Sequence, residues 1–581
     1  MQHRLWSVPE LVDMVLGELS LLPDSKAPLA RLARTGRLFR GPALQHLYKR
    51  IDGKGLHAIC TLMHPASGDK FETSFTVRRT RFSVYADLVQ SVTLDSSPVI
   101  SVRRPAIDWN ADHISTALAT VEAENPFPRL QELVVHQLNL KTFHIVLRLI
   151  APTLTHFTVN SPHSYPRARS VWSDQEYGLC IATILRRVRA INCQIVYLQL
   201  CRIPVAKAIY ECELLDLLQS LRTLTAFHMD YDLLEIAGML SLIAQIPSLT
   251  SFTVYNGSYS PKRQIPSILD DLRKMRMPFQ TLVELTFAGT MYDVAMLLST
   301  VKGPLKHVSL DTEYPVNLYP VFGQTIQAIR NFASALESVA LHFWSAAEPQ
   351  PDSLPIPWDT YAPVLQCRKL TSLSIVHTGA IRTTLGDLQI RRLAESLPLL
   401  NSLDLSTGPT ERPGLQSLYS STENVKSATL ATLAAVASQC PSLKFFKIRG
   451  LDARGGLSTT AGISRSPGVV TFNFVDCPIS SPSEVALSLQ SIWPNADLII
   501  KAEASVGRGQ TYQPAWKAVQ ALVEYHRLVR RAQGQPSSHP EVVPARQIHQ
   551  VDKLLRLRDS GNVEPYSGNV EPYSLTSTDE E

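Results

Sequence analysis

The stretch IPSLTSFTVY, at Ile246–Tyr255, joins a proline, one variable residue and a leucine to apolar residues three and five positions after that leucine. Close variants recur along the chain: FPRLQELVVH from Phe127, APTLTHFTVN from Ala151, LPLLNSLDLS from Leu397 and CPSLKFFKIR from Cys440. The alternation after the leucine has the period of two that is typical of a strand with one buried face. The repetition predicts a chain built from one recurring structural unit.

Twelve such phrases align on the first apolar position of the pattern L-x-x-L-x-L. These first positions are Val89, Leu130, Leu154, Leu224, Leu249, Leu282, Leu305, Leu336, Leu370, Leu400, Leu443 and Val469, and a weaker phrase, CQIVYLQL, starts at Cys193. Amphipathic helical runs such as YDLLEIAGMLSLIAQ precede most phrases, and the proline ends the helix because it cannot continue the hydrogen-bond ladder. No single strand–helix unit can bury its own apolar face, so we predict that the units stack.

The pattern resembles the leucine-rich repeat family, although the regular Asn or Cys that follows the strand in that family is absent and the intervals are irregular. The resemblance implies an α/β fold: an irregular horseshoe with parallel strands on its concave face and helices outside. The alternative is an ordinary α/β domain with a coincidental rhythm. Polar inserts begin shortly after the strands, at Asn160, Asn256, Ser345, Ser406 and Gly450. They should line one rim, where they either carry recognition or fall where insertions are tolerated.

The first fifty residues predict three helices. Ser7 and Glu10 have the spacing of a capping box, and Pro9 suits the first turn of a helix. A second helix is expected to carry Leu29, Leu32, Leu38 and Phe39, and a third to start after Pro42. So short a segment cannot bury a good core alone, so some of its apolar residues should face a partner or the repeats.

These residues resemble the F-box family over about positions 5–51. The match is carried by Val8-Pro9-Glu10-Leu11, Val15-Leu16, Leu19, Leu29, Leu32, Arg37, Phe39, Leu44, Leu47 and Tyr48. The chain departs from the pattern at Val8, Thr35-Gly36 and Tyr48, where Leu, Val-Cys and Trp are common. PLARLARTGRLFRGPALQHLY and RFSVYADLVQSVTLD are also similar to the large F-box families of mushroom-forming fungi.

The F-box resemblance implies a module that docks on the Skp-type adaptor of a cullin–RING ubiquitin ligase. The residues expected at that interface are Val8, Pro9, Glu10, Leu11, Val15, Leu16, Leu32, Leu38, Phe39, Leu44 and Tyr48. An F-box followed by leucine-rich repeats implies a substrate-recognition subunit of an SCF-type (Skp–cullin–F-box) E3 ligase, which would hold an unidentified protein target through its repeats and rim inserts. Weaker target-binding candidates at outward strand positions are Tyr255, His342, Asp404, Lys447 and Arg449.

Two other classes of function stay open. One is a non-catalytic leucine-rich-repeat interaction scaffold that does not join a ubiquitin ligase. The other is an enzyme, but the sequence contains no GxGxxG, GxxxxGK[ST], HExxH or GxSxG motif. We therefore expect no catalytic residues, no cofactor and no metal site.

Composition excludes several partners and suggests a compartment. Of 581 residues, 45% are hydrophobic and 18% are charged, which suits a long continuous core. The net charge of +5 and the absence of dense Lys/Arg clusters with interleaved aromatics argue against nucleic acid. Eight cysteines without CxxC spacing predict reduced thiols in the cytoplasm, the nucleus or both. No apolar run approaches the ~18 residues of a membrane span.

The predicted organisation has five parts. Residues 1–52 form the F-box-like module, 53–80 a connector, 81–505 the solenoid, 506–558 the C-terminal capping helices and 559–581 a disordered tail. The first capping helix is expected at QPAWKAVQALVEYHRLVRRAQ, from Gln513, because the open end of a solenoid must be covered.

Overall fold

The computed structural model describes residues 8–22, 24–63, 75–95, 110–121, 124–136, 138–160, 173–203, 207–256, 272–313, 319–344, 356–378, 385–407, 428–455, 468–475, 477–494, 496–503 and 513–532. The chain divides into two compact units. The first comprises Met1–Glu348 with Asp359–Leu370, and the second comprises Pro349–Trp358 with Thr371–Glu581.

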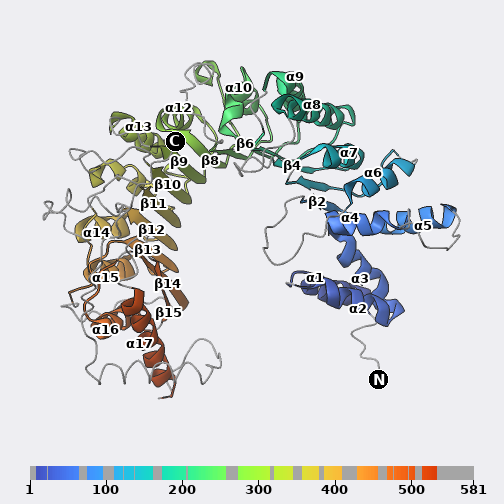
Figure 1. Ribbon diagram of the computed structural model, residues 1–581. Helices are drawn as coiled ribbons and strands as arrows, with labels where there is room; N and C mark the ends of the chain where they lie inside the picture. The colour runs from blue at the N-terminus through green and yellow to red at the C-terminus, as the bar shows by residue number, and fades with distance from the viewer. Residues whose placement is uncertain are drawn as a thin grey trace, which may run out of the picture. The chain divides into compact units, whose positions relative to one another are not determined.

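The described part of the first unit contains ten parallel strands in chain order (Figure 1). They are β1 (Arg50–Asp52), β2 (Ser91–Leu94), β3 (Glu132–Val135), β4 (His156–Asn160), β5 (Tyr197–Cys201), β6 (Ala226–Asp230), β7 (Ser251–Tyr255), β8 (Glu284–Thr290), β9 (His307–Glu313) and β10 (Ser338–Trp344). Each pairs in parallel with the next strand of the chain.

The described part of the second unit repeats this arrangement with five strands. They are β11 (Ser372–Thr378), β12 (Ser402–Thr407), β13 (Phe445–Arg449), β14 (Gly468–Val475) and β15 (Ala496–Glu503), again parallel and in chain order. The predicted α/β fold of parallel strand–helix repeats is therefore confirmed within each unit.

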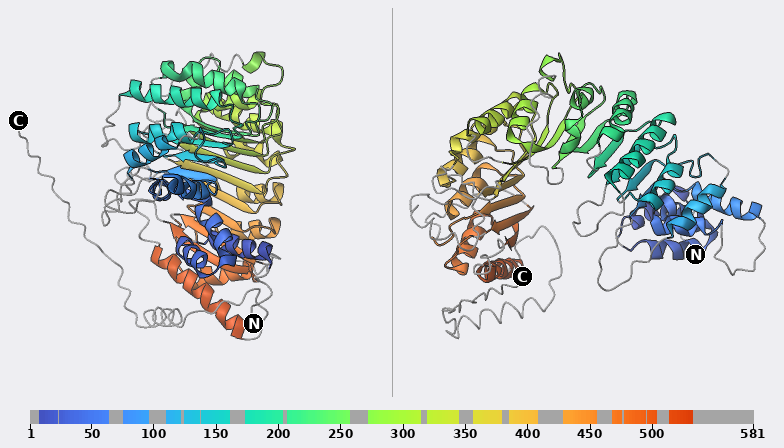
Figure 2. Two further views of the ribbon diagram at one scale, coloured as in Figure 1. Left: turned by 90° about the vertical axis from the view of Figure 1, so that its right-hand side faces the viewer. Right: turned by 45° about the horizontal axis from the view of Figure 1, so that its top comes forward.

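Helices connect the strands and, within each unit, lie along one face of the sheet (Figure 2). In the first unit they are α4 (Gly53–Cys60), α5 (Phe75–Ala86), α6 (Ala111–Thr120), α7 (Leu140–Leu149), α8 (Asp174–Ala190), α9 (Lys207–Ser220), η2 (Tyr231–Glu235), α10 (Met239–Ala244), α12 (Met291–Thr300), α13 (Tyr319–Ile329), η3 (Arg330–Phe332) and η5 (Val364–Gln366). The short η4 (Trp358–Tyr361) precedes η5, and the second unit contains α14 (Asp387–Ser396), α15 (Leu430–Gln439), α16 (Pro482–Ile492) and α17 (Gln513–Ala532). The sheet face away from the helices is called the open face below.

The aligned leucines form the core between sheet and helices. Eleven of the twelve predicted first positions are at most 2% exposed. Val469 is the exception, because β14 begins one residue before it and pairs it with Asp497 of β15, leaving its side chain 43% exposed. The next two apolar positions of that repeat, Phe472 and Phe474, are buried as expected.

Hydrogen bonds explain the residues around each core leucine. The amide of Thr250 donates to the carbonyl of Thr225 at 2.8 Å, and the carbonyl of Thr250 accepts from the amide of Val283 at 2.8 Å, so the ladder continues into the turn. The hydroxyl of Thr281, one residue before its core leucine, donates to the carbonyl of Leu249 at 2.8 Å. The same hydroxyl contact to the preceding repeat recurs at Thr153, Thr223 and Ser248.

The N-terminal module contains α1 (Pro9–Ser20), α2 (Lys26–Thr35) and α3 (Arg37–Lys49), packed on a core of Val12, Leu16, Leu29 and Ala43. The predicted boundary between the second and third helices is wrong, because Leu38 and Phe39 lie in α3 and Pro42 lies inside it. Gly36 is extended and separates the two helices. Gly41 has no Cβ to meet the ring of Pro42, so the helix passes through the proline. Val8, without a side-chain hydrogen bond, holds the N-cap position predicted for Ser7, which lies outside the described residues.

The end of the second unit is covered by α17, which packs on α16 and β15. Trp516 of α17 is 2% exposed, and its indole N–H donates to the carbonyl of Cys477 at 2.9 Å. Its ring stacks on Phe474 with centroids 4.1 Å apart. The indole ring of Trp516 therefore covers the end of the hydrophobic core of the second unit.

Several predictions concern residues outside the described part of the chain. These are most of the rim inserts, at 161–172, 257–271, 345–355, 408–427 and 456–467, the second capping helix, and the tail at 559–581. The strands before the inserts are β4, β7, β10, β12 and β13. Among the described helices, none has the length and apolar content needed to cross a bilayer.

Candidate interaction surfaces

Helix α1 is apolar on two faces. Val12 and Leu16 point into the core of the module. A second set of apolar side chains on the helix and its C-terminal turn is exposed: Val8 (39%), Met14 (58%), Val15 (39%), Leu21 (74%) and Leu22 (57%). These five residues are called the outer face of α1. The exposed acidic side chains of Glu10, Asp13 and Glu18 lie on the same helix. Exposed apolar side chains gathered on one small module mark a candidate docking surface, so the outer face is one.

The residues predicted to bind an adaptor fall into three groups. Val8, Pro9, Glu10, Val15 and Leu38 are exposed, whereas Leu11, Leu32, Phe39, Leu44 and Tyr48 are half-buried and Leu16 is buried. Leu32 and Phe39 pack against the core of the module. The ring of Tyr48 lies 4.9 Å from that of Tyr85 in α5. The structure therefore groups Val8 and Val15 on one exposed face and places Leu16 inside.

Met14, Leu21 and Leu22 were not predicted as interface residues, because the expected interface was taken from the positions of the F-box pattern. The seven-residue spacing of Val8, Val15 and Leu22 was the available signal, since it places the three side chains on one helix face.

A second candidate surface lies on the open face of the first unit, where side chains of β5, β6 and β7 meet. Tyr197, His228 and Tyr255 form what is called the tyrosine–histidine cluster. The rings of Tyr197 and His228 have centroids 4.8 Å apart, and those of His228 and Tyr255 are 6.1 Å apart. Both phenol oxygens approach Nδ1 of His228, at 3.2 Å from Tyr197 and 3.4 Å from Tyr255.

Polar neighbours hold this cluster in place. The hydroxyl of Tyr197 donates to Oε1 of Gln199 at 2.8 Å, and Nε2 of Gln199 donates to Oδ1 of Asn160 at 3.4 Å. The ring of His156 stacks beside Tyr197 with centroids 5.9 Å apart. These contacts extend from β4 to β7 and fix the edges of the rings by hydrogen bonds. The side chain of Tyr255 is 39% exposed.

Burial keeps the cluster uncharged near neutral pH. Partial burial lowers the pKa of His228, opposed by the nearby carboxylate of Glu284. Burial also raises the pKa of Tyr197 to about 12, with the charge of the Tyr255 phenolate adding to the shift. The cluster therefore presents neutral rings with polar edges.

Asp230 supports the edge of this surface. Its side chain is 4% exposed and accepts the backbone amide of Arg202, whose φ of 57° places it in the left-handed region. Burial raises the pKa of Asp230 to about 6. Asp230 is the register partner of Tyr255. It therefore lies beside the cluster and also holds the turn after β5 through the amide of Arg202.

The remaining predicted target-binding residues do not join this cluster. His342 of β10 approaches Asp311 of β9, with Nδ1 and Oδ1 3.3 Å apart. In the second unit Lys447 lies opposite Asp404 in register, with Nζ and Oδ2 4.0 Å apart. Arg449 is two residues along the same strand as Lys447. Tyr255 alone of the five belongs to the tyrosine–histidine cluster.

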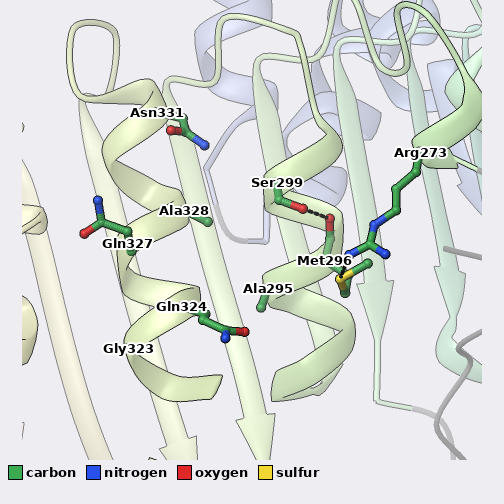
Figure 3. Close-up of a pocket in the computed structure, with 9 residues that line it drawn as sticks. All are labelled: Arg273, Ala295, Met296, Ser299, Gly323, Gln324, Gln327, Ala328 and Asn331. Atoms are coloured by element: carbon green, nitrogen blue, oxygen red, sulfur yellow. Dashed lines mark hydrogen bonds between the residues drawn. The ribbon is translucent and has the colours of Figure 1, made fainter. Parts of the chain in front are cut away.

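Figure 3 shows a groove of about 690 Å³ between α12 and α13. It is lined by Arg273, Ala295, Met296, Ser299, Gly323, Gln324, Gln327, Ala328 and Asn331. Nη2 of Arg273 lies 2.9 Å from Sδ of Met296. Among the described lining residues, the guanidinium of Arg273 lies beside small side chains and amides. Within the described residues, no group of three or more His, Cys, Asp or Glu side chains is placed to hold a metal ion.

Comparisons with known proteins give no family. No family model matches the sequence, and no curated protein matches it. Among solved structures, the chain is similar to one in the crystal structure of the Rad7 and Elc1 complex in yeast, with a TM-score of 0.39 and 15% sequence identity. That match covers 72% of this chain and 92% of the other. A similarity of this size shows no shared function.

Proposed function

We propose that the chain is the substrate-recognition subunit of an SCF-type ubiquitin ligase. The N-terminal module would bind a Skp-type adaptor, and the strand–helix repeats would hold a protein target. The chain would perform no chemistry itself, because its contribution is the proximity of the target to the conjugating enzyme.

The outer face of α1 is the observation that supports this proposal most. Five apolar side chains are exposed on α1 and the residues that flank it, while Val12 and Leu16 of the same helix already fill the core of the module. Covering them with a partner removes apolar surface from water, at about 25 cal/mol for each Å² buried. The F-box resemblance of residues 5–51 implies an adaptor of the Skp type as that partner.

Co-expression of the full-length chain with a Skp-type adaptor tests the proposal. A double variant, Val8→Glu with Val15→Glu, places two charges on the outer face without entering the core, so the module should still fold. We expect the adaptor to co-purify with the wild type and to be lost from the double variant. Leu179→Glu, at a 54% exposed position on α8, is the matched control and should retain the adaptor. Far-ultraviolet circular dichroism of each variant checks that it is folded.

The second candidate is a repeat scaffold that joins no ligase. It is favoured by the internal use of several family-pattern residues, since Leu16 is buried and Tyr48 contacts Tyr85. Failure of the folded wild-type chain to bind the adaptor would support the scaffold. Retention of the adaptor by the double variant would show that docking does not use the outer face.

A further inference from the structure

We propose that the open face of the first unit recognises a basic segment of the target, with an arginine side chain seated on the tyrosine–histidine cluster. This inference rests on the proposed function and deepens it by naming the chemistry of the target.

The cluster has the geometry of a cation-binding platform. Cations bind over aromatic faces at distances of up to about 6 Å from the ring centroid. The ring centroids of Tyr197 and Tyr255 lie 4.8 and 6.1 Å from that of His228, and the rings are inclined to it by 61° and 66°. A guanidinium stacked on the face of one ring therefore lies beside the edge of the next ring. Hydrogen bonds at the ring edges hold the rings before any ligand arrives, which reduces the ordering cost of binding.

The charge of the surrounding strands selects the sign of the ligand. Strands β2 to β10, as described, contain no lysine or arginine. They carry carboxylates at Glu132, Glu284 and Asp311 on the open face. Glu132 and Glu284 lie in the same row across β3 to β8 as Tyr197, on opposite sides of it. An anionic ligand would meet repulsion from both sides, whereas a cationic one is attracted.

Arginine fits this arrangement better than lysine. Its planar guanidinium stacks on aromatic faces and forms paired hydrogen bonds with carboxylates, whereas the lysine ammonium is a compact, strongly hydrated charge. In the row from β3 to β8, the carboxylates of Glu132 and Glu284 lie at the two ends, and the rings of His156 and Tyr197 lie between them. An extended segment with several arginines can therefore contact both the carboxylates and the rings. The basic side chains Lys447 and Arg449 belong to the second unit and are not part of this surface.

Fluorescence polarisation with a labelled twelve-residue peptide of alternating arginine and glycine tests the inference. The comparison peptide carries citrulline, a neutral isostere, at every arginine. The full-length chain should bind the arginine peptide at least about tenfold more tightly than the citrulline peptide. Tyr255→Ala and Glu284→Lys should each weaken binding of the arginine peptide about tenfold. Both replaced side chains are exposed, and Lys447→Gln in the second unit should leave binding unchanged.

Three results would overturn the inference: no binding of the arginine peptide at millimolar concentration, equal binding of the citrulline peptide, or binding that Glu284→Lys leaves unchanged. Its failure is distinguishable from failure of the proposed function, because adaptor binding is measured on the outer face of α1. A chain that binds the adaptor but ignores the arginine peptide overturns this inference alone. A chain that binds the peptide but never the adaptor overturns the ligase assignment.

Discussion

Gly303 offers a quantitative test of how closely successive repeats approach one another. A Cβ added at this position would lie 2.5 Å from the carbonyl oxygens of both Leu282 and Phe279. These are backbone atoms in the turn before β8, where Phe279 has a φ of 54° and donates its amide to the carbonyl of Ala244 at 2.9 Å. The turn must therefore move to accept a methyl group.

The expected cost follows from two opposing terms. Forcing an extra methyl into a packed site costs about 1–3 kcal/mol. Replacing glycine by alanine also restricts the unfolded chain, which stabilises the native state by about 0.4–1 kcal/mol. Because both close contacts are to backbone, the steric term prevails, and Gly303→Ala should lower the free energy of unfolding by about 1–2 kcal/mol.

Gly323→Ala provides the matched control. Gly323 lies inside α13, and an added Cβ there meets nothing within 4 Å, so alanine should stabilise the helix by about 0.5–1 kcal/mol. Urea unfolding of both variants gives the free energies, and amide hydrogen exchange in β8 reports the local effect. Equal stability of the two variants would refute the backbone contact between these repeats.

Three further predictions concern the cap, the open face and the turns. Trp516→Ala removes the ring stacked on Phe474 and should destabilise the second unit by about 3–5 kcal/mol, measured by urea unfolding; unchanged stability would show that α17 is dispensable. Asp230 has a folded-state pKa raised to about 6 against about 4 when unfolded, so the wild type should lose about 2–3 kcal/mol relative to Asp230→Asn as pH rises from 4 to 7. A pH-independent difference in their unfolding free energies would contradict this. Thr281→Val removes the hydroxyl donor to the carbonyl of Leu249 and should lower the unfolding midpoint by an amount equivalent to about 1 kcal/mol, an effect absent if the turn is held by its backbone alone.

The repeat could be predicted from sequence because its signal is local. A core leucine followed by alternating apolar residues specifies which strand face is buried, and the buried first positions from Leu130 to Leu443 follow that rule. The proline two residues before the leucine accompanies it at Leu130, Leu154, Leu249, Leu400 and Leu443. The rule missed β1 and β15, which lack the phrase, and it misread Val469, where pairing with β15 extends the strand upstream. Pairing with a neighbouring strand is not visible in a single phrase.

The candidate surfaces depend on relations that sequence alone does not contain. Tyr197 and Tyr255 are 58 positions apart in the sequence, and only the register of β5, β6 and β7 brings them to His228. Tyr255 was predicted as an outward residue because alternation within one strand sufficed. In the N-terminal module, Gly36 and Gly41 moved the helix boundary, so Leu38 became an exposed residue of α3.

Hydrogen–deuterium exchange of the full-length chain, with and without a Skp-type adaptor, tests the central claim most directly, because it reports both binding and its location. We expect adaptor-dependent protection of the amides of α1 and its C-terminal turn, with those of α8 and α12 unchanged. Protection confined to the repeats, or no protection anywhere at saturating adaptor, would contradict the claim that the outer face of α1 is a docking surface.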